Sequence, residues 1–208
     1  MHSMSVWLLF ILLALVLLGW LVAYMFAQKP VTNIQQLIQQ QRYADAVAEA
    51  DRQLARKPND SAAHLHRAEA LKLLGRFDEA IDSYRKSSDP AAREGIALVL
   101  AHQRRDLPEA LRLMQEQIAQ YPQIQEFQQL GLAYIQLRSG DREAALRTFR
   151  DNIELLETRF RDDYTDPDPL LAETLYIFGA LCDANGDPSA ATLLRGRAAA
   201  WAPGSWFG

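Results

Sequence analysis

A short pattern recurs five times along the 208-residue chain, and this recurrence constrains the fold more than any other feature of the sequence. Each copy has a turn-forming or polar pair, then an alanine five residues further on, then a run of residues that suits a helix. A catalytic site needs its residues only once, so a repeated pattern of this kind indicates an architectural module. The alanines lie 34, 30, 35 and 46 residues apart and are Ala46, Ala80, Ala110, Ala145 and Ala191.

Three prolines close the repeats at an even spacing. Pro58, Pro90 and Pro122 follow one another every 32 residues, and proline is disfavoured in a helix interior because it lacks an N–H and clashes with the preceding turn. Self-similarity with a period of about 20–50 residues is typical of solenoids, in which each helical hairpin packs on its neighbours. The sequence therefore predicts an all-α solenoid of four to five helix–turn–helix repeats.

The residues at fixed places in the units carry a family resemblance. The second unit has Gly75, Phe77 and Tyr84 around the start of its second helix, and "LGLAY" at 130–134 lies in the first helix of the fourth unit. These features resemble the tetratricopeptide repeat (TPR) family over about residues 33–203. The resemblance implies units at about residues 33–60, 61–90, 91–123, 124–157 and 172–203, followed by a C-terminal tail at 204–208. Two Asp-Pro steps depart from the family pattern and predict an acidic loop at 158–171.

Small and acidic residues have structural roles in this interpretation. Gly131 allows the two helices of a hairpin to approach closely, and Gly75 ends a helix with a positive φ at little steric cost. Asp78 and Glu79 lie in the first turn of the next helix, where the helix dipole favours acidic side chains. We therefore interpret these two residues as a helix start rather than an acid/base pair. The unit that closes at Pro90 is about four residues short, so its second helix should be short too.

The N-terminal stretch at 6–26 carries no charged residue. A helix of that length reaches about 30 Å, which is the thickness of the hydrocarbon core of a bilayer. A cleaved signal peptide would need a basic start, a shorter apolar core and a small-residue cleavage site, and this stretch has none of them. We expect a short tail at 1–5, a transmembrane helix at 6–27 and a juxtamembrane linker at 28–32. Its interfacial aromatic anchors would be Trp7, Trp20 and Tyr24.

The orientation of this anchor is less constrained by the sequence. Lys29 and Arg42 follow the apolar stretch, whereas residues 1–5 contain no lysine or arginine. The positive-inside tendency favours a single-pass protein of the bacterial inner membrane with its TPR domain in the cytoplasm. A periplasmic domain stays open as the alternative.

Composition and motifs argue against several function classes. The net charge is −4 and no basic stripe with aromatic residues occurs, so we expect no nucleic-acid partner. Cys182 is the only cysteine, which excludes an intramolecular disulfide. His64 and His66 cannot share a helix face as a metal pair, and the acidic cluster at 162–168 lacks the spacing of a calcium loop. His102 has no sequence neighbour that completes a nucleophile–base pair. We expect no cofactor, no bound metal and no enzymatic activity.

The TPR resemblance implies a concave groove lined by the first helices of the units. The clamp with which some TPR domains grip chaperone tails is missing, because Leu65 and Glu69 take the first two of its places. Glutamine amides both donate and accept hydrogen bonds, so we expect a neutral peptide or helix as partner. The predicted groove residues are Leu65, Glu69, Lys72, Leu73, Gly95, Val99, His102, Gln103, Gln125, Gln128, Gln129, Leu132, Gln136, Glu173, Tyr176, Ala180 and Asp183.

The resemblance implies a noncatalytic scaffold or assembly factor, anchored in the membrane, that binds a protein partner in this groove. Anchored bacterial TPR proteins of similar layout serve envelope assembly and cytochrome c maturation. The alternative is an accessory structural subunit of a membrane protein complex, held mainly through its transmembrane helix. Trp206 and Phe207 in the tail have no repeat position, so they either bind elsewhere or cap the end of the solenoid.

Overall fold

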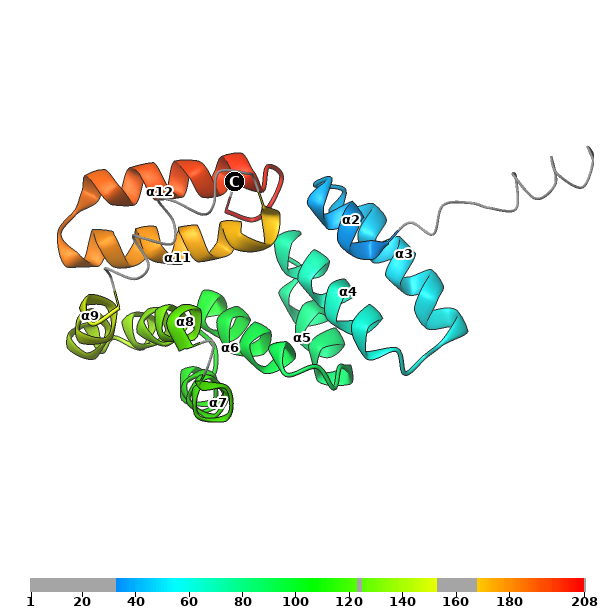
Figure 1. The fold of residues 1–208 in the computed structure, drawn as a ribbon, viewed down its shortest axis with the longest axis horizontal. Helices are drawn as coiled ribbons and strands as arrows, with labels where there is room; N and C mark the ends of the chain where they lie inside the picture. Colours follow the sequence, from blue (N-terminus) through cyan, green and yellow to red (C-terminus); the bar gives the residue numbers. More distant parts are fainter. Residues whose placement is uncertain (1–32, 123–124, 153–167, 208) are drawn as a thin grey trace, which may run out of the picture. The chain divides into compact units, whose positions relative to one another are not determined.

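A computed structural model describes residues 33–122, 125–152 and 168–207 of the chain. All regular structure in these residues is helical, and no strand occurs among them, which confirms the predicted all-α fold (Figure 1). From Ile34 onward the chain forms one compact unit. Its helices are α2 (Ile34–Gln39), α3 (Tyr43–Arg56), α4 (Ser61–Leu73), α5 (Phe77–Lys86), α6 (Ala91–Gln103), α7 (Leu107–Gln120), α8 (Gln125–Arg138), α9 (Arg142–Arg150), α11 (Pro169–Asn185) and α12 (Pro188–Trp201).

The helices are arranged as consecutive hairpins. Within each hairpin the first helix packs on the second, giving the pairs α2–α3, α4–α5, α6–α7, α8–α9 and α11–α12. Successive hairpins also touch, through α3 with α4, α5 with α6 and α7 with α8. Each predicted unit therefore contains one helical hairpin, and neighbouring hairpins bury a continuous apolar core between them.

Helix α5 shows how the local sequence sets the corners. Gly75 precedes it with φ +72°, a left-handed conformation in which glycine has little steric cost. Asp78 and Glu79 lie in its first turn and Arg85 and Lys86 in its last, which suits the helix dipole at both ends. The helix has 10 residues, against 14 in α3 and 14 in α7, as the short unit predicts.

Two glycines permit close approach between helices. A Cβ on Gly131 would lie 2.8 Å from the Cε atom of Met114, so the Met114 side chain of α7 can take its observed place against α8 only without that atom. A Cβ on Gly95 would overlap the ring of Tyr84, which is fully buried between α5 and α6. Gly131 was predicted to lie between the two helices of one hairpin, and the structure instead places it where α8 meets α7 of the preceding hairpin.

The first helices of the hairpins form a closed cycle of contacts. Helix α2 touches α4, α4 touches α6, α6 touches α8, α8 touches α11, and α11 returns to α2. Hydrogen bonds reinforce the return, from the Gln39 amide to Asp168 Oδ1 at 3.0 Å and from the Gln41 amide to the Trp201 carbonyl at 3.5 Å. We call the face that these five helices turn toward one another the inner face. The resemblance implied a concave groove lined by these first helices, and here the last hairpin also contacts the first.

Helix α11 starts earlier than the sequence suggested. Pro169 is its first residue and lies inside the predicted loop 158–171, while the unit was expected to begin at residue 172. Proline is well tolerated in the first turn, where its missing N–H would have no helical partner. The side chain of Asp168 caps the helix by accepting a hydrogen bond from the Leu170 N–H at 2.9 Å. The Asp-Pro step therefore begins a helix here instead of extending a loop.

The predicted membrane anchor lies outside the described residues. This applies to the apolar stretch 6–26 with Trp7, Trp20 and Tyr24, and to most of the acidic loop, residues 158–167. Among the residues that the structure does describe, none of the helices combines the length and the apolar character that crossing a membrane requires.

Candidate partner-binding site

Four polar side chains from four different helices meet on the inner face, and we call them the buried polar chain. Glu173 of α11 accepts hydrogen bonds from the Lys72 ammonium of α4 and, at 2.7 Å, from His102 Nε2 of α6. His102 Nδ1 lies 3.0 Å from the hydroxyl of Tyr134 on α8. Only 1 % of the His102 side chain and 7 % of the Glu173 side chain are exposed. The buried polar chain therefore ties together four of the five helices that form the cycle.

The charges along the buried polar chain compensate one another. Burial opposes ionisation of Glu173, but the Lys72 ammonium and the hydrogen bond from His102 outweigh it and lower the pKa of this carboxyl to about 2. Burial likewise opposes the charge on Lys72, yet the neighbouring Glu173 raises the pKa of the ammonium above its usual value. Burial lowers the pKa of His102, so we assign the neutral ring, with Nε2–H donating to Glu173 and Nδ1 accepting from Tyr134.

This arrangement differs from what the sequence indicated for His102, which has no candidate partner nearby in the chain. Tyr134 and Glu173 are 32 and 71 residues away, and folding brings both into hydrogen-bond distance. A tyrosine, a histidine and a glutamate in a row can in principle transfer protons. The near-complete burial of the His102 ring keeps a substrate away from it, so the contact joins helices.

The C-terminal tail occupies part of the inner face beside the buried polar chain. The backbone N–H of Trp206 donates to the Leu73 carbonyl at 3.0 Å, which joins the tail to the end of α4. The indole ring lies 4.3 Å from the His102 ring and 5.2 Å from the Tyr176 ring, measured between centroids. Phe207 stacks on Tyr176 at 5.5 Å. The tail residues were expected to bind elsewhere or to cap the end of the solenoid, and the structure instead packs them against its inner face.

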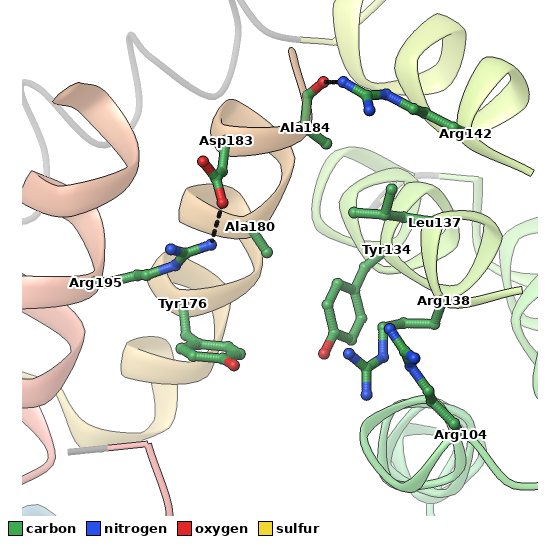
Figure 2. A pocket seen from close by; sticks show the side chains of 10 residues that line it. All are labelled: Arg104, Tyr134, Leu137, Arg138, Arg142, Tyr176, Ala180, Asp183, Ala184 and Arg195. Atoms are coloured by element: carbon green, nitrogen blue, oxygen red, sulfur yellow. Dashed lines mark hydrogen bonds and ion pairs between the residues drawn. The ribbon is translucent and has the colours of Figure 1, made fainter. Parts of the chain in front are cut away.

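Next to the tail a pocket stays open, and we call it the arginine pocket. It has a volume of about 430 Å³ and lies between α8 and α11, with contributions from the end of α6, the start of α9 and the middle of α12 (Figure 2). Figure 2 shows Tyr134, Arg138 and Arg104 on one wall, with Tyr176, Asp183 and Arg195 on the other. The pocket is lined by Arg104, Tyr134, Leu137, Arg138, Arg142, Tyr176, Ala180, Asp183, Ala184 and Arg195.

The arginines of this pocket are held in different ways. Arg195 pairs with Asp183 at 3.1 Å. Arg138 donates to the carbonyls of Ala101 and His102 at 3.0 and 2.9 Å, and Arg142 donates to the carbonyl of Ala184. These carbonyls end α6 and α11, where cationic side chains are favoured by the helix dipole.

Apart from Gln125, the predicted groove residues fall into three groups. Tyr176, Ala180 and Asp183 line the arginine pocket, and Lys72, His102 and Glu173 form the buried polar chain. The side chain of Gln125 lies outside the described residues, although its backbone begins α8. The others are buried or partly buried in helix contacts: Leu65, Glu69, Leu73, Gly95, Val99, Gln103, Gln128, Gln129, Leu132 and Gln136.

The arginines that line the pocket were missed by the sequence analysis. Arg104 and Arg138 end two successive first helices and lie 34 residues apart, which is one repeat period. That spacing is the one signal that could have placed them together. Arg142 and Arg195 lie on second helices, which the family pattern does not assign to the groove. Within the described part of the chain, no group of three or more His, Cys, Asp or Glu side chains could hold a metal ion.

Comparison with known proteins gives a similarity in fold. No family profile matches the chain, and no curated protein does. The MamA RS-1 ArsTM double mutant aligns with a TM-score of 0.53 and 14 % identity over 81 % of this chain and 89 % of that chain. A crystal structure of the MamA protein gives 0.51 and 14 % over 81 % and 87 %.

A chain of the APC/C hetero-tetramer Cut9–Hcn1 aligns with a TM-score of 0.55 and 14 % identity, over 76 % of this chain and 30 % of that chain. At this level of identity the likeness concerns the fold alone. Together with the consecutive packed hairpins, it shows that the chain has a TPR-like helical repeat fold.

Proposed function

We propose that this chain is a noncatalytic scaffold or assembly factor that holds a segment of a protein partner in the arginine pocket. The observation that carries the proposal is the pocket itself, because it stays open where the tail and the buried polar chain fill the neighbouring inner face. Repeat folds of stacked hairpins typically bind other proteins along such faces. Aromatic and arginine side chains, which dominate binding energy at protein interfaces, line both of its walls.

We also propose that the scaffold is anchored in a membrane through residues 6–27. The support is the sequence, since 6–26 is uncharged and long enough to cross a bilayer. Lys29 favours the cytoplasmic side of a bacterial inner membrane for the domain. A Ser139→Cys variant tests the side, because Ser139 is exposed and the native Cys182 is buried. A cytoplasmic domain predicts that a membrane-impermeant maleimide labels it only after the cells are opened.

Filling the pocket tests the binding function. Ala180 lines the pocket, so Ala180→Trp would place an indole inside it. Ala200 is exposed on α12 and does not line the pocket, so Ala200→Trp is the matched control. We expect cross-linking in membranes, followed by affinity capture and mass spectrometry, to recover a partner with the wild type and the control but not with Ala180→Trp. Equal recovery by both variants would refute binding in this pocket.

The alternative role, an accessory subunit held through the membrane helix, predicts the opposite pattern. Replacing residues 6–26 by an unrelated apolar span of equal length should then abolish capture, while Ala180→Trp should leave it intact. For a partner bound by the pocket, the replacement span should retain capture because the anchor would only position the domain.

A further inference from the structure

The arginine pocket carries more positive charge than its surroundings account for. Four arginines line it and one carboxylate, Asp183, faces them (Figure 2). The chain as a whole has a net charge of −4, so this concentration does not reflect a basic protein. Guanidinium groups gathered around one concave space raise the local potential and attract anions.

Only one of these four guanidinium groups has an acidic partner among the described residues. Arg195 pairs with Asp183, whereas Arg138 and Arg142 donate to neutral backbone carbonyls. The Arg104 side chain makes neither a hydrogen bond nor an ion pair with any residue in the described part of the chain, and it is exposed in the pocket. Three positive charges therefore lie at the pocket without a described counter-charge.

The geometry of these groups suits carboxylates. The planar guanidinium fork can donate two parallel hydrogen bonds to one carboxylate, and such charge-assisted bonds are stronger than neutral ones. The two carbonyls that hold Arg138 restrict its side chain before any ligand arrives, which reduces the entropy lost on binding. The rings of Tyr134 and Tyr176 and the side chain of Leu137 supply apolar walls for the methylene groups of a peptide.

We infer that the partner segment in this pocket is acidic and that its carboxylates pair with Arg104, Arg138 and Arg142. This inference rests on the proposed function, because it names the chemistry of the partner that the pocket holds. It replaces the neutral partner expected from the glutamines of the groove. Gln128 is buried within the helix packing, and Gln136 already accepts a hydrogen bond from Thr148 at 3.1 Å.

Calorimetric titration of the full chain in a nonionic detergent tests this inference with defined probes. The probes are acetylated triglutamate with an amidated end, the same peptide with a free carboxylate end, triglutamine, and inorganic phosphate. The variants are Arg104→Gln and Arg105→Gln, which remove the same charge from adjacent positions. Arg105 is the matched control because it pairs with Asp78 at 2.7 Å and does not line the pocket.

We expect triglutamate to bind the wild type, triglutamine not to bind, and added salt to weaken the binding. Loss of one charge-assisted contact should weaken triglutamate binding by at least about tenfold in Arg104→Gln, while Arg105→Gln stays within about twofold of the wild type. Tighter binding of the free-ended peptide would assign the main contact to a terminal carboxylate. Equal binding of both peptides would assign it to acidic side chains.

Four results would overturn the inference: no binding of triglutamate, equal binding of triglutamine and triglutamate, equal weakening in both variants, or phosphate binding as tightly as triglutamate. The last would make the pocket a site for small anions. Failure of the inference about an acidic partner can be told apart from failure of the proposed function. If Ala180→Trp abolishes capture of the partner while triglutamate does not bind, the scaffold stands with a partner that is not acidic. If Ala180→Trp captures the partner normally, the proposed function itself fails.

Discussion

Removing the carboxylate of Glu173 should lower the free energy of unfolding of the domain more than any surface substitution. Glu173 is 5 % exposed and accepts hydrogen bonds from Lys72 and His102, so Glu173→Ala leaves the Lys72 ammonium buried without its counter-charge. Removing one partner of a buried ion pair typically costs about 3–5 kcal/mol. A domain of this kind has about 5–15 kcal/mol of stability in total, so we expect a large fraction of it to be lost.

Urea unfolding of the full chain in detergent, followed by far-UV circular dichroism, measures this effect. With a slope of about 2 kcal/mol per molar urea, a loss of 4 kcal/mol moves the midpoint down by roughly 2 M. Arg105→Ala is the control, because its ion pair with Asp78 is exposed and such pairs contribute only about 0.2–1 kcal/mol.

A double variant separates loss of the pair from loss of packing. Lys72→Met with Glu173→Leu removes both charges and keeps side chains of similar size, so it should recover most of the stability lost in Glu173→Ala. A single variant within about 1 kcal/mol of the wild type would refute the reasoning. It would mean that the buried polar chain does not stabilise the closed cycle of helices.

Three further predictions follow from single observations. The pKa of Glu173 in the folded protein is about 2, below its ordinary value of 4.5, so its stabilising contribution is complete above pH 4.5 and is lost as the pH falls from 4.5 through 2. Urea midpoints measured across that range should therefore fall more steeply in the wild type than in Glu173→Gln. Gly95→Ala should destabilise the chain by about 1–3 kcal/mol because its methyl group overlaps the Tyr84 ring. Gly196→Ala, in open space on α12, should stabilise it by about 0.5–1 kcal/mol. The thermal unfolding midpoint should therefore fall in the first variant and rise in the second. Trp206→Ala should cost about 2–4 kcal/mol in urea unfolding, since four aromatic rings lose their contact with the indole. An unchanged midpoint would show that the tail does not hold the inner face.

Much of the fold could be predicted from residues close together in the chain. A helical hairpin depends on local signals, namely apolar spacing within a helix, a glycine with positive φ at the corner and acidic residues in the next first turn. Gly75, Asp78 and Glu79 supply these signals for α5, and the structure places them as expected. The repeat period then indicated that hairpins stack, because one hairpin cannot bury its apolar face alone.

The candidate site was predicted only in part, for a physical reason. Tyr176, Ala180 and Asp183 were found because they occupy repeat positions on a first helix. Arg142 and Arg195 were missed because they reach the pocket from second helices. Whether a side chain on a helix faces solvent or a pocket depends on which other helices approach it, and that information is not local.

The amino-acid sequence by itself therefore determined the helices, their pairing into hairpins and the TPR-like repeat. The tertiary structure alone decided that α11 returns to α2, that Lys72 meets Glu173 101 residues further on, and that Trp206 docks on the end of α4. The reason is that small rotations between successive hairpins add up along the repeats. Their sum decides whether the first and last hairpins meet, and no short stretch of sequence records it.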